Sequence, residues 1–185
     1  MLHRKLVSAA LFFLLSFVCA QTASAQLPGL DKSPADIAYF RTSRSEAPVA
    51  KIVYSRPQKH ERTIFGGLVP YGEVWRTGAN EATEIDFFRD ATFGGKHVKA
   101  GRYSLFTIPG EKTWTIILSS ALDEWGAFSY DKSKDVLRVD APVSQTEGEV
   151  EAFTIQFQGT PPSGKLIFAW DRTWVEVPVS VAKSR

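Results

Sequence analysis

The sequence predicts an all-β protein: a single antiparallel β-sandwich, jelly-roll-like, with one long loop that crosses between strands. The clearest observation is a period of two in residues 151–158, where Phe153, Ile155 and Phe157 share one face and polar residues share the other. Short runs rich in β-branched and aromatic residues recur along the chain, separated by Gly, Pro and Asp turn signals. No segment sustains the 3.6-residue apolar period of an amphipathic helix, so strands are expected to form the whole domain.

Eight or nine short strands are expected along the chain. The Gly94-Gly95 pair predicts a hairpin between residues 91–93 and 97–99, and Asp171-Arg172 predicts a tight hairpin between the last two strands. Residues 35–40 either pair as an edge strand or stay irregular, and residues 120–127 have room for one or two helical turns. The remaining strands are expected among the candidate runs 49–54, 84–88, 102–108, 113–119, 135–140, 151–158, 165–170 and 173–181, not all of which need form a separate strand.

The N-terminus has the three parts of a secretory signal peptide. Arg4 and Lys5 form the positive region, residues 6–20 form the apolar region, and Ala23-Ser24-Ala25 is a small-residue cleavage site. The apolar run is shorter than the roughly 20 residues that cross a bilayer, which argues against a retained anchor. Lipoprotein processing at Cys19 fits poorly, because a bulky residue precedes the cysteine.

This pattern divides the chain into a signal peptide (1–25), a linker or edge segment (26–47) and the β-sandwich domain (48–182). Cleavage leaves no membrane span, so we expect an exported protein, either periplasmic or extracellular. Removal of Arg4 and Lys5 from the 22 basic residues leaves 20, equal to the 20 acidic residues. A neutral domain lacks the basic excess of a nucleic-acid-binding protein.

The chemistry available to the mature chain is limited. The only cysteine of the full sequence, Cys19, is removed with the signal peptide, and the mature chain therefore has no thiol for catalysis or for metal binding. His60 and His97 lie in separate loops and form no pair with metal-ligand spacing, so no metal site is expected. Phosphate loops and dinucleotide fingerprints are absent from the sequence, and no cofactor is expected. The oligomeric state stays open.

The long loop from about Pro57 to Thr83 differs from the rest of the chain. Its second half, Tyr71–Thr83, places aromatic rings and hydrogen-bonding side chains among proline and glycine residues. Loops of this composition on a β scaffold commonly bind ligands, and a sugar, a peptide end or a small carboxylate would suit these groups. The candidate ligand-binding residues are Arg56, Tyr71, Glu73, Trp75, Arg76, Asn80 and Glu81.

Three functional interpretations remain open at this level. The first is a non-catalytic module that binds a small polar or carbohydrate-like ligand, a glycan, or an envelope partner through the Tyr71–Thr83 loop. The second is an envelope hydrolase with Glu73 or Glu81 as acid or base, although no catalytic residue can be assigned and the nucleophile elbow of serine hydrolases is absent. The third is a purely structural domain, in which the polar loop residues satisfy irregular backbone. The placement of Arg76 discriminates between scaffold and ligand site.

A second aromatic cluster lies at residues 125–130, in the run WGAFSY. It either lines a cleft together with Trp75 and Tyr71 or covers the core of the sandwich.

Four runs resemble the domain-of-unknown-function 2911 (DUF2911) family: YSRP, IFGGLVPYGEVWRTGANEAT, AGRYSLFTIPGEKTWTIIL and WGAFSYDKSKDVLRV. The similarity extends from about residue 30 to residue 181. It implies a bacterial protein with a signal peptide, but no activity and no catalytic residue. The resemblance marks Tyr71, Glu73, Trp75, Arg76, Asn80, Glu81 and Thr83 as part of the family's hallmark segment.

Overall fold

The computed structural model describes residues 27–182, so the expected signal peptide lies outside the described residues. Within this range the chain forms nine β-strands and one short 3-10 turn, and Asp31 begins the compact unit that contains all of them. The strands are β1 (Ala35–Phe40), β2 (Ala50–Ser55), β3 (Thr83–Phe87), β4 (Ala91–Phe93), β5 (Lys96–Val98), β6 (Gly101–Ile108), β7 (Thr113–Ser119), β8 (Asp135–Thr160) and β9 (Ser163–Val181), and the turn is η1 (Lys132–Lys134).

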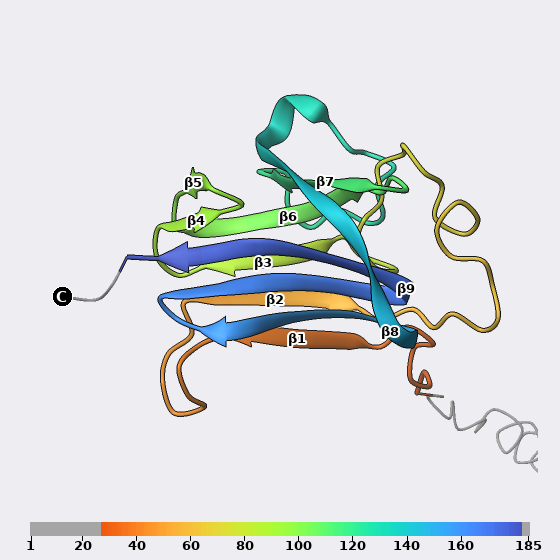
Figure 1. The fold of residues 1–185 in the computed structure, drawn as a ribbon, viewed down its shortest axis with the longest axis horizontal. Helices are drawn as coiled ribbons and strands as arrows, with labels where there is room; N and C mark the ends of the chain where they lie inside the picture. Colours follow the sequence, from red (N-terminus) through yellow and green to blue (C-terminus); the bar gives the residue numbers. More distant parts are fainter. Residues whose placement is uncertain (1–26, 183–185) are drawn as a thin grey trace, which may run out of the picture. The chain divides into compact units, whose positions relative to one another are not determined.

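The nine strands form one antiparallel sheet in the order β1-β2-β3-β6-β7-β8-β9-β4-β5, which confirms the all-β prediction. Most strands pair with the next strand in the chain. The β4–β5 hairpin is the exception: β3 pairs with β6, and β4 pairs with β9 at the other end of the strand order. Figure 1 shows β8 passing diagonally in front of the other strands, from the region of β7 to that of β9. The jelly-roll connectivity stays a prediction.

The last two strands are much longer than the sequence suggested. β8 pairs with β7 over Asp135–Pro142 and with β9 from Val143 onward, so a single strand serves two neighbours. The prediction of a hairpin at Asp171-Arg172 was wrong. Strand β9 continues through these two residues, and the turn that joins β8 to β9 lies between Thr160 and Ser163. The ladder shifts register around Val150, opposite Asp171, whose φ is +53°. An aspartate tolerates that conformation, and a bulge lets both strands continue past it.

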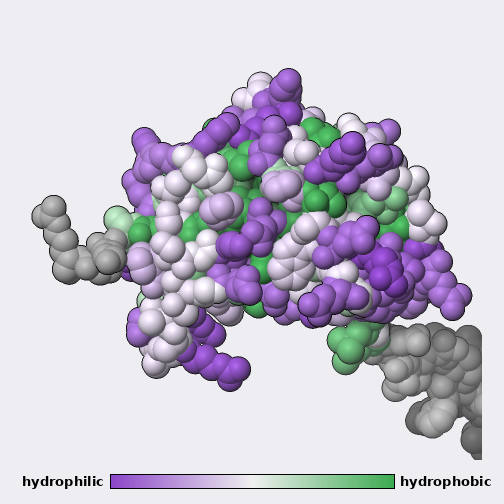
Figure 2. Space-filling view, in the orientation of Figure 1, coloured by the Kyte–Doolittle hydropathy of each residue, from purple (hydrophilic) through white to green (hydrophobic). Residues whose placement is uncertain are grey.

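The hydrophobic core follows from the alternation along the strands. One large cluster collects the inward side chains of nearly every strand, including Ile52, Ile85, Trp114 and Phe168. A smaller cluster of Ala82, Phe106 and Ile117 lies apart from it. Figure 2 shows the outer surface in this view as mostly hydrophilic or neutral, with separate small hydrophobic patches.

The loop between β2 and β3 has no strand of its own in residues 56–82. It is the gold to yellow segment gathered at one end of the strands in Figure 1. Isolated bridges tie it to the sheet, such as Trp75 with Thr107 of β6 and Gln58 with Ala152 of β8. No helix within residues 27–182 is long and apolar enough to span a membrane.

Candidate functional site

Trp75 anchors the loop to the core. Its backbone N–H donates to Thr107 O (2.7 Å) and its carbonyl accepts from Thr107 N (2.9 Å), which adds the loop to the end of β6. The Trp75 ring stacks on Trp170 with centroids 6.0 Å apart and also contacts Phe153 at 5.0 Å. Its indole N–H donates to Gly78 O (3.1 Å). Trp75, one of the predicted ligand-binding residues, therefore packs against the core.

The backbone next to Trp75 is held in a strained shape. Thr77 has φ +57°, which is rare for a β-branched residue, and Asn80 has φ +58°. Thr77 is fully buried, its Oγ1 donates to Trp75 O (3.3 Å), and it shares a hydrogen bond with Thr107 Oγ1 (3.1 Å). Thr83 Oγ1 donates to Thr77 O (2.7 Å). Such strain persists only where surrounding contacts over-determine it, and here it fixes where Arg76 leaves the loop.

Arg76 is half-buried and its guanidinium is not compensated. Its Nε is buried and has no hydrogen-bond partner in the described part of the chain, and no residue in that part forms an ion pair with the side chain. Burial lowers the pKa of Arg76, and no neighbouring charge opposes this shift. An arginine keeps its proton at neutral pH, so this is a positive charge held partly out of water. Buried charges are normally paired.

Arg76 lines a cavity of about 530 Å³. This size lies within the range of small-molecule sites. Trp75, Trp170 and Glu73 line the same cavity. The structure therefore brings three of the seven sequence-predicted residues together: Glu73, Trp75 and Arg76.

Arg62 is a second cation in this cavity that the sequence analysis did not single out. Its Nε donates to Lys59 O (2.8 Å) and its Nη2 donates to Gln58 O, so two backbone carbonyls hold the guanidinium in place. Neither partner carries a charge, and the positive charge of Arg62 is therefore not neutralised by them. The cavity thus contains two cationic side chains and one carboxylate, that of Glu73.

The segment of residues 125–128 passes beside Arg76. Gly126 N donates to Asn80 O (3.0 Å) and Ala82 N donates to Glu124 O (2.8 Å), so this segment pairs with the end of the long loop. A Cβ built on Gly126 would lie 3.3 Å from Arg76 Nη1 and 2.7 Å from the Phe128 ring. Phe128 lines the cavity, whereas Tyr71 does not. The second aromatic cluster therefore contributes to the cavity through Ala127 and Phe128.

Two other predicted residues have partners inside the protein. Arg56 donates to Asp36 Oδ2 (3.0 Å), Phe153 O (3.1 Å) and Thr154 Oγ1 (2.8 Å), which ties β1, the loop and β8 together. Asn80 Nδ2 donates to Asp31 Oδ1 (3.1 Å). Both side chains act as scaffold here, and neither lines the Arg76 cavity.

The last two predicted residues lie elsewhere. The Tyr71 ring packs over Gly66, where a Cβ would lie 2.8 Å from the ring, so the glycine is needed for this contact. Glu81 lines a separate concave surface of about 280 Å³ with Glu84, Arg102 and Asp123. There Arg102 pairs with both Glu84 and Asp123. Glu73 and Glu81 thus do not face one cavity.

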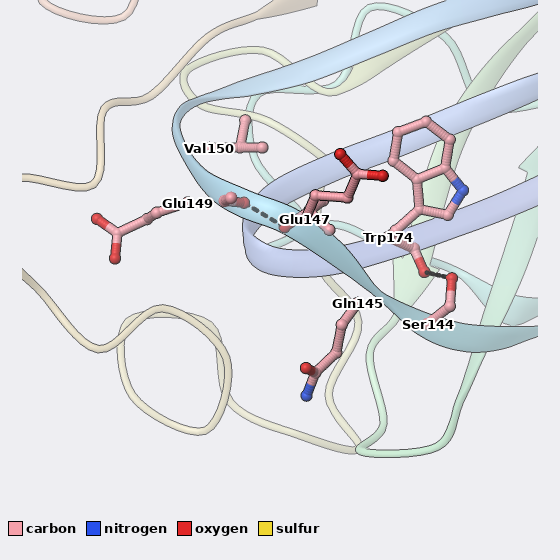
Figure 3. A pocket seen from close by; sticks show the side chains of 8 residues that line it. Ser144, Gln145, Glu147, Glu149, Val150 and Trp174 are labelled. Carbon is pink, nitrogen blue, oxygen red and sulfur yellow. Dashed lines mark hydrogen bonds between the residues drawn. The ribbon is translucent and has the colours of Figure 1, made fainter.

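A further concave surface of about 570 Å³ lies at the register shift between β8 and β9 (Figure 3). Trp174 is its only ring, and its two charged residues, Glu147 and Glu149, are acidic. Glu149 points away from the Trp174 ring in Figure 3 and pairs with Lys59 (3.2 Å). No group of three His, Cys, Asp or Glu side chains that could hold a metal ion exists among residues 27–182. The Arg76 cavity is therefore the stronger candidate site.

The loop and the strands that hold it also match a known family model. The model for DUF2911, a protein of unknown function, matches residues 33–179. This chain belongs to the DUF2911 family. No curated protein and no solved structure matches this chain. The match includes β1 as well as the long loop, so Arg76 and its supporting contacts lie within the shared region of this DUF2911 domain.

Sequence reasoning on the DUF2911 domain missed Arg62, Phe128 and Trp170 as cavity residues. Phe128 had a signal in the WGAFSY run, where a glycine separates two aromatic residues. Trp170 is 1% exposed and lies in a regular strand run, so its alternation indicated only core. Arg62 lies in a charged stretch, and nothing in the pattern distinguishes it from a solvated residue.

Proposed function

We propose that this domain is a non-catalytic binding module, and that it takes a small ligand with an anionic group in the cavity around Arg76. The observation that carries the proposal is the half-buried guanidinium whose Nε has no partner among residues 27–182. An anion in the cavity would neutralise this charge by accepting from the terminal Nη groups of Arg76, which are not among the buried atoms without a partner. Arginine is well suited to carboxylates and phosphates, because its planar fork can bond two oxygens at once.

The rigidity of the loop supports the same proposal. Trp75 and Thr77 are locked by hydrogen bonds and ring contacts on both sides of Arg76. A site that holds its cation in place before binding loses less conformational entropy when the ligand arrives. A loop whose polar residues served only to satisfy backbone would have paired Arg76 as it pairs Arg56.

The hydrolase alternative has less support. A paired-carboxylate mechanism needs two carboxyl groups facing the same substrate, and among residues 27–182 only Glu73 brings a carboxylate to the Arg76 cavity. The acidic groups around Glu81 include Glu84 and Asp123, which are both paired with Arg102. The purely structural alternative remains the reading that the binding experiment must exclude.

Export is a second part of the proposal. It rests on the positive, apolar and small-residue regions of residues 1–25, and it would bring the domain to the periplasm or outside the cell. Mass spectrometry of the protein recovered from cells is expected to show a chain that begins at Gln26. A chain that keeps residues 1–25 would overturn this part.

Thermal-shift measurements of the purified protein against a panel of small carboxylates and phosphates test the binding proposal. A ligand that binds the native state raises Tm as its concentration increases. We expect at least one anion to do so for the wild type and for Arg44→Met, an exposed arginine outside the cavity. The shift should disappear in Arg76→Met. An equal shift in Arg76→Met would overturn the assignment of the site.

A further inference from the structure

Most residues that line the Arg76 cavity have apolar side chains, although polar and apolar atoms share its exposed surface almost equally. Four of its residues carry polar side chains: Ser33, Arg62, Glu73 and Arg76. The large side chains among the rest are Leu68, Val69, Val74, Trp75, Phe128 and Trp170. A sugar presents several hydroxyl groups that each need a partner when buried. This lining has few polar side chains that could satisfy them, and its apolar side chains favour contact with hydrocarbon.

Phe128 adds an unusual apolar wall. Its side chain is 80% exposed, although it lines the cavity, and it stacks on Trp125, which is 62% exposed. The two rings lie 5.7 Å apart with their planes at 19°. Two neighbouring aromatic rings left in water indicate a surface that gains stability when something covers it.

The position of Phe128 relates this wall to the charge. Its ring lies against Gly126, whose backbone in turn lies against Arg76 Nη1. An anion on Arg76 would therefore bring the rest of the same molecule into the neighbourhood of an aromatic face. The charged side chains of the lining are Arg62, Arg76 and Glu73, which give two positive charges and one negative charge. This balance favours a ligand of net negative charge.

We infer that the cavity selects an organic carboxylate with an apolar, ring-sized body over a sugar acid, and that Phe128 determines this selectivity. In this arrangement Arg76 binds the carboxylate, and the body lies against Phe128 and the exposed part of Trp75. The inference rests on the proposed function and narrows its ligand class.

Isothermal titration of the purified protein with three probes tests it: phenylacetate, its neutral analogue phenylacetamide, and glucuronate. Phenylacetate is expected to bind at least about tenfold more tightly than either of the others, the difference that one aromatic contact or one charge-assisted hydrogen bond can supply. Phe128→Ala should weaken phenylacetate binding about fivefold to tenfold. Phe88→Ala is the matched control, because Phe88 is exposed and lies outside the cavity.

The outcomes separate the two claims. Glucuronate binding as tightly as phenylacetate, or an unchanged phenylacetate affinity in Phe128→Ala, would overturn the apolar selectivity. Anion binding at Arg76 would survive that result if Arg76→Met still abolished glucuronate binding. Equal affinities for phenylacetate and phenylacetamide, or no saturable binding of either acid, would overturn both the selectivity and the proposed anion site.

Discussion

The backbone of Gly126 lies against the guanidinium of Arg76, so close that a Cβ on Gly126 would be 3.3 Å from Arg76 Nη1. The same Cβ would be 2.7 Å from the ring of Phe128. Gly126 also has φ +78°, a conformation that glycine adopts without steric cost. A single glycine thus permits both the local turn and the close approach of Arg76 and of Phe128 to the same backbone position.

The substitution Gly126→Ala separates these two roles when it is compared with Gly95→Ala. Gly95 has a similar φ of +80°, and a Cβ there would meet nothing within 4 Å. Both variants should lose about 1–2 kcal/mol of unfolding free energy from the left-handed backbone. Gly126→Ala alone should displace Phe128 from Trp125 and change the tryptophan fluorescence. Identical spectra for the two variants would contradict the contact.

Arg76 and Arg56 should respond in opposite ways to replacement by methionine. Arg76→Met removes a desolvated charge whose Nε has no partner within residues 27–182, so the ligand-free protein should be unchanged or about 1 kcal/mol more stable. Arg56→Met removes three hydrogen bonds and leaves Asp36 without its ion-pair partner, which should cost about 2–3 kcal/mol.

Chemical denaturation measures both values, and each kcal/mol corresponds to about 2–4 °C in Tm for a domain of this size. A large loss of stability in Arg76→Met would mean that the side chain is part of the scaffold.

The buried hydroxyl of Thr77 should be necessary for the shape of the loop. Thr77→Val keeps the side-chain volume and the branched Cβ but removes the hydrogen bonds to Trp75 O and Thr107 Oγ1. We expect a loss of about 1–3 kcal/mol, because the Thr107 hydroxyl is then left unsatisfied in the interior. Thr92→Val on β4 is the control and should be near neutral, since no hydrogen bond of its hydroxyl occurs in the described chain. Equal effects of the two substitutions would refute this role.

Stability should decline at alkaline pH, partly through Tyr54. Burial raises the pKa of Tyr54, whose ring packs edge-on against Phe153 in the core. The unfolded chain loses the tyrosine proton first, near pH ~10. The unfolding free energy should therefore be constant below that pH and fall as the pH rises toward the raised pKa.

The comparison of Tyr54→Phe with the wild type measures this contribution. Tyr54→Phe should flatten part of the alkaline decline, and the remainder should persist because burial also raises the pKa of Tyr103 and Tyr130. An alkaline profile of Tyr54→Phe that follows the wild type would contradict the assignment.

Much of the fold could be predicted from local pattern. β7 has the bounds that the alternation of Trp114, Ile116 and Leu118 predicted, and the Gly94-Gly95 pair forms the turn between β4 and β5. These elements depend on nearby residues, whose period of two specifies which side chains face the core. The pattern failed at Asp171, because an aspartate that ends a strand and one that occupies a bulge have the same local signature, and only pairing with β8 distinguishes them.

The sequence alone determined the strand-rich class, the family resemblance, and the loop in which Arg76 lies. It could not determine which polar residues of that loop have partners, because those partners are distant in the chain: Thr154 for Arg56 and Asp31 for Asn80. Only the tertiary structure decided that Arg76 has no such acceptor for its buried Nε within residues 27–182 and that Phe128, 52 positions further along, lies over the same cavity. Hydrogen-bond satisfaction is a property of three-dimensional neighbours, and composition along a loop cannot report it.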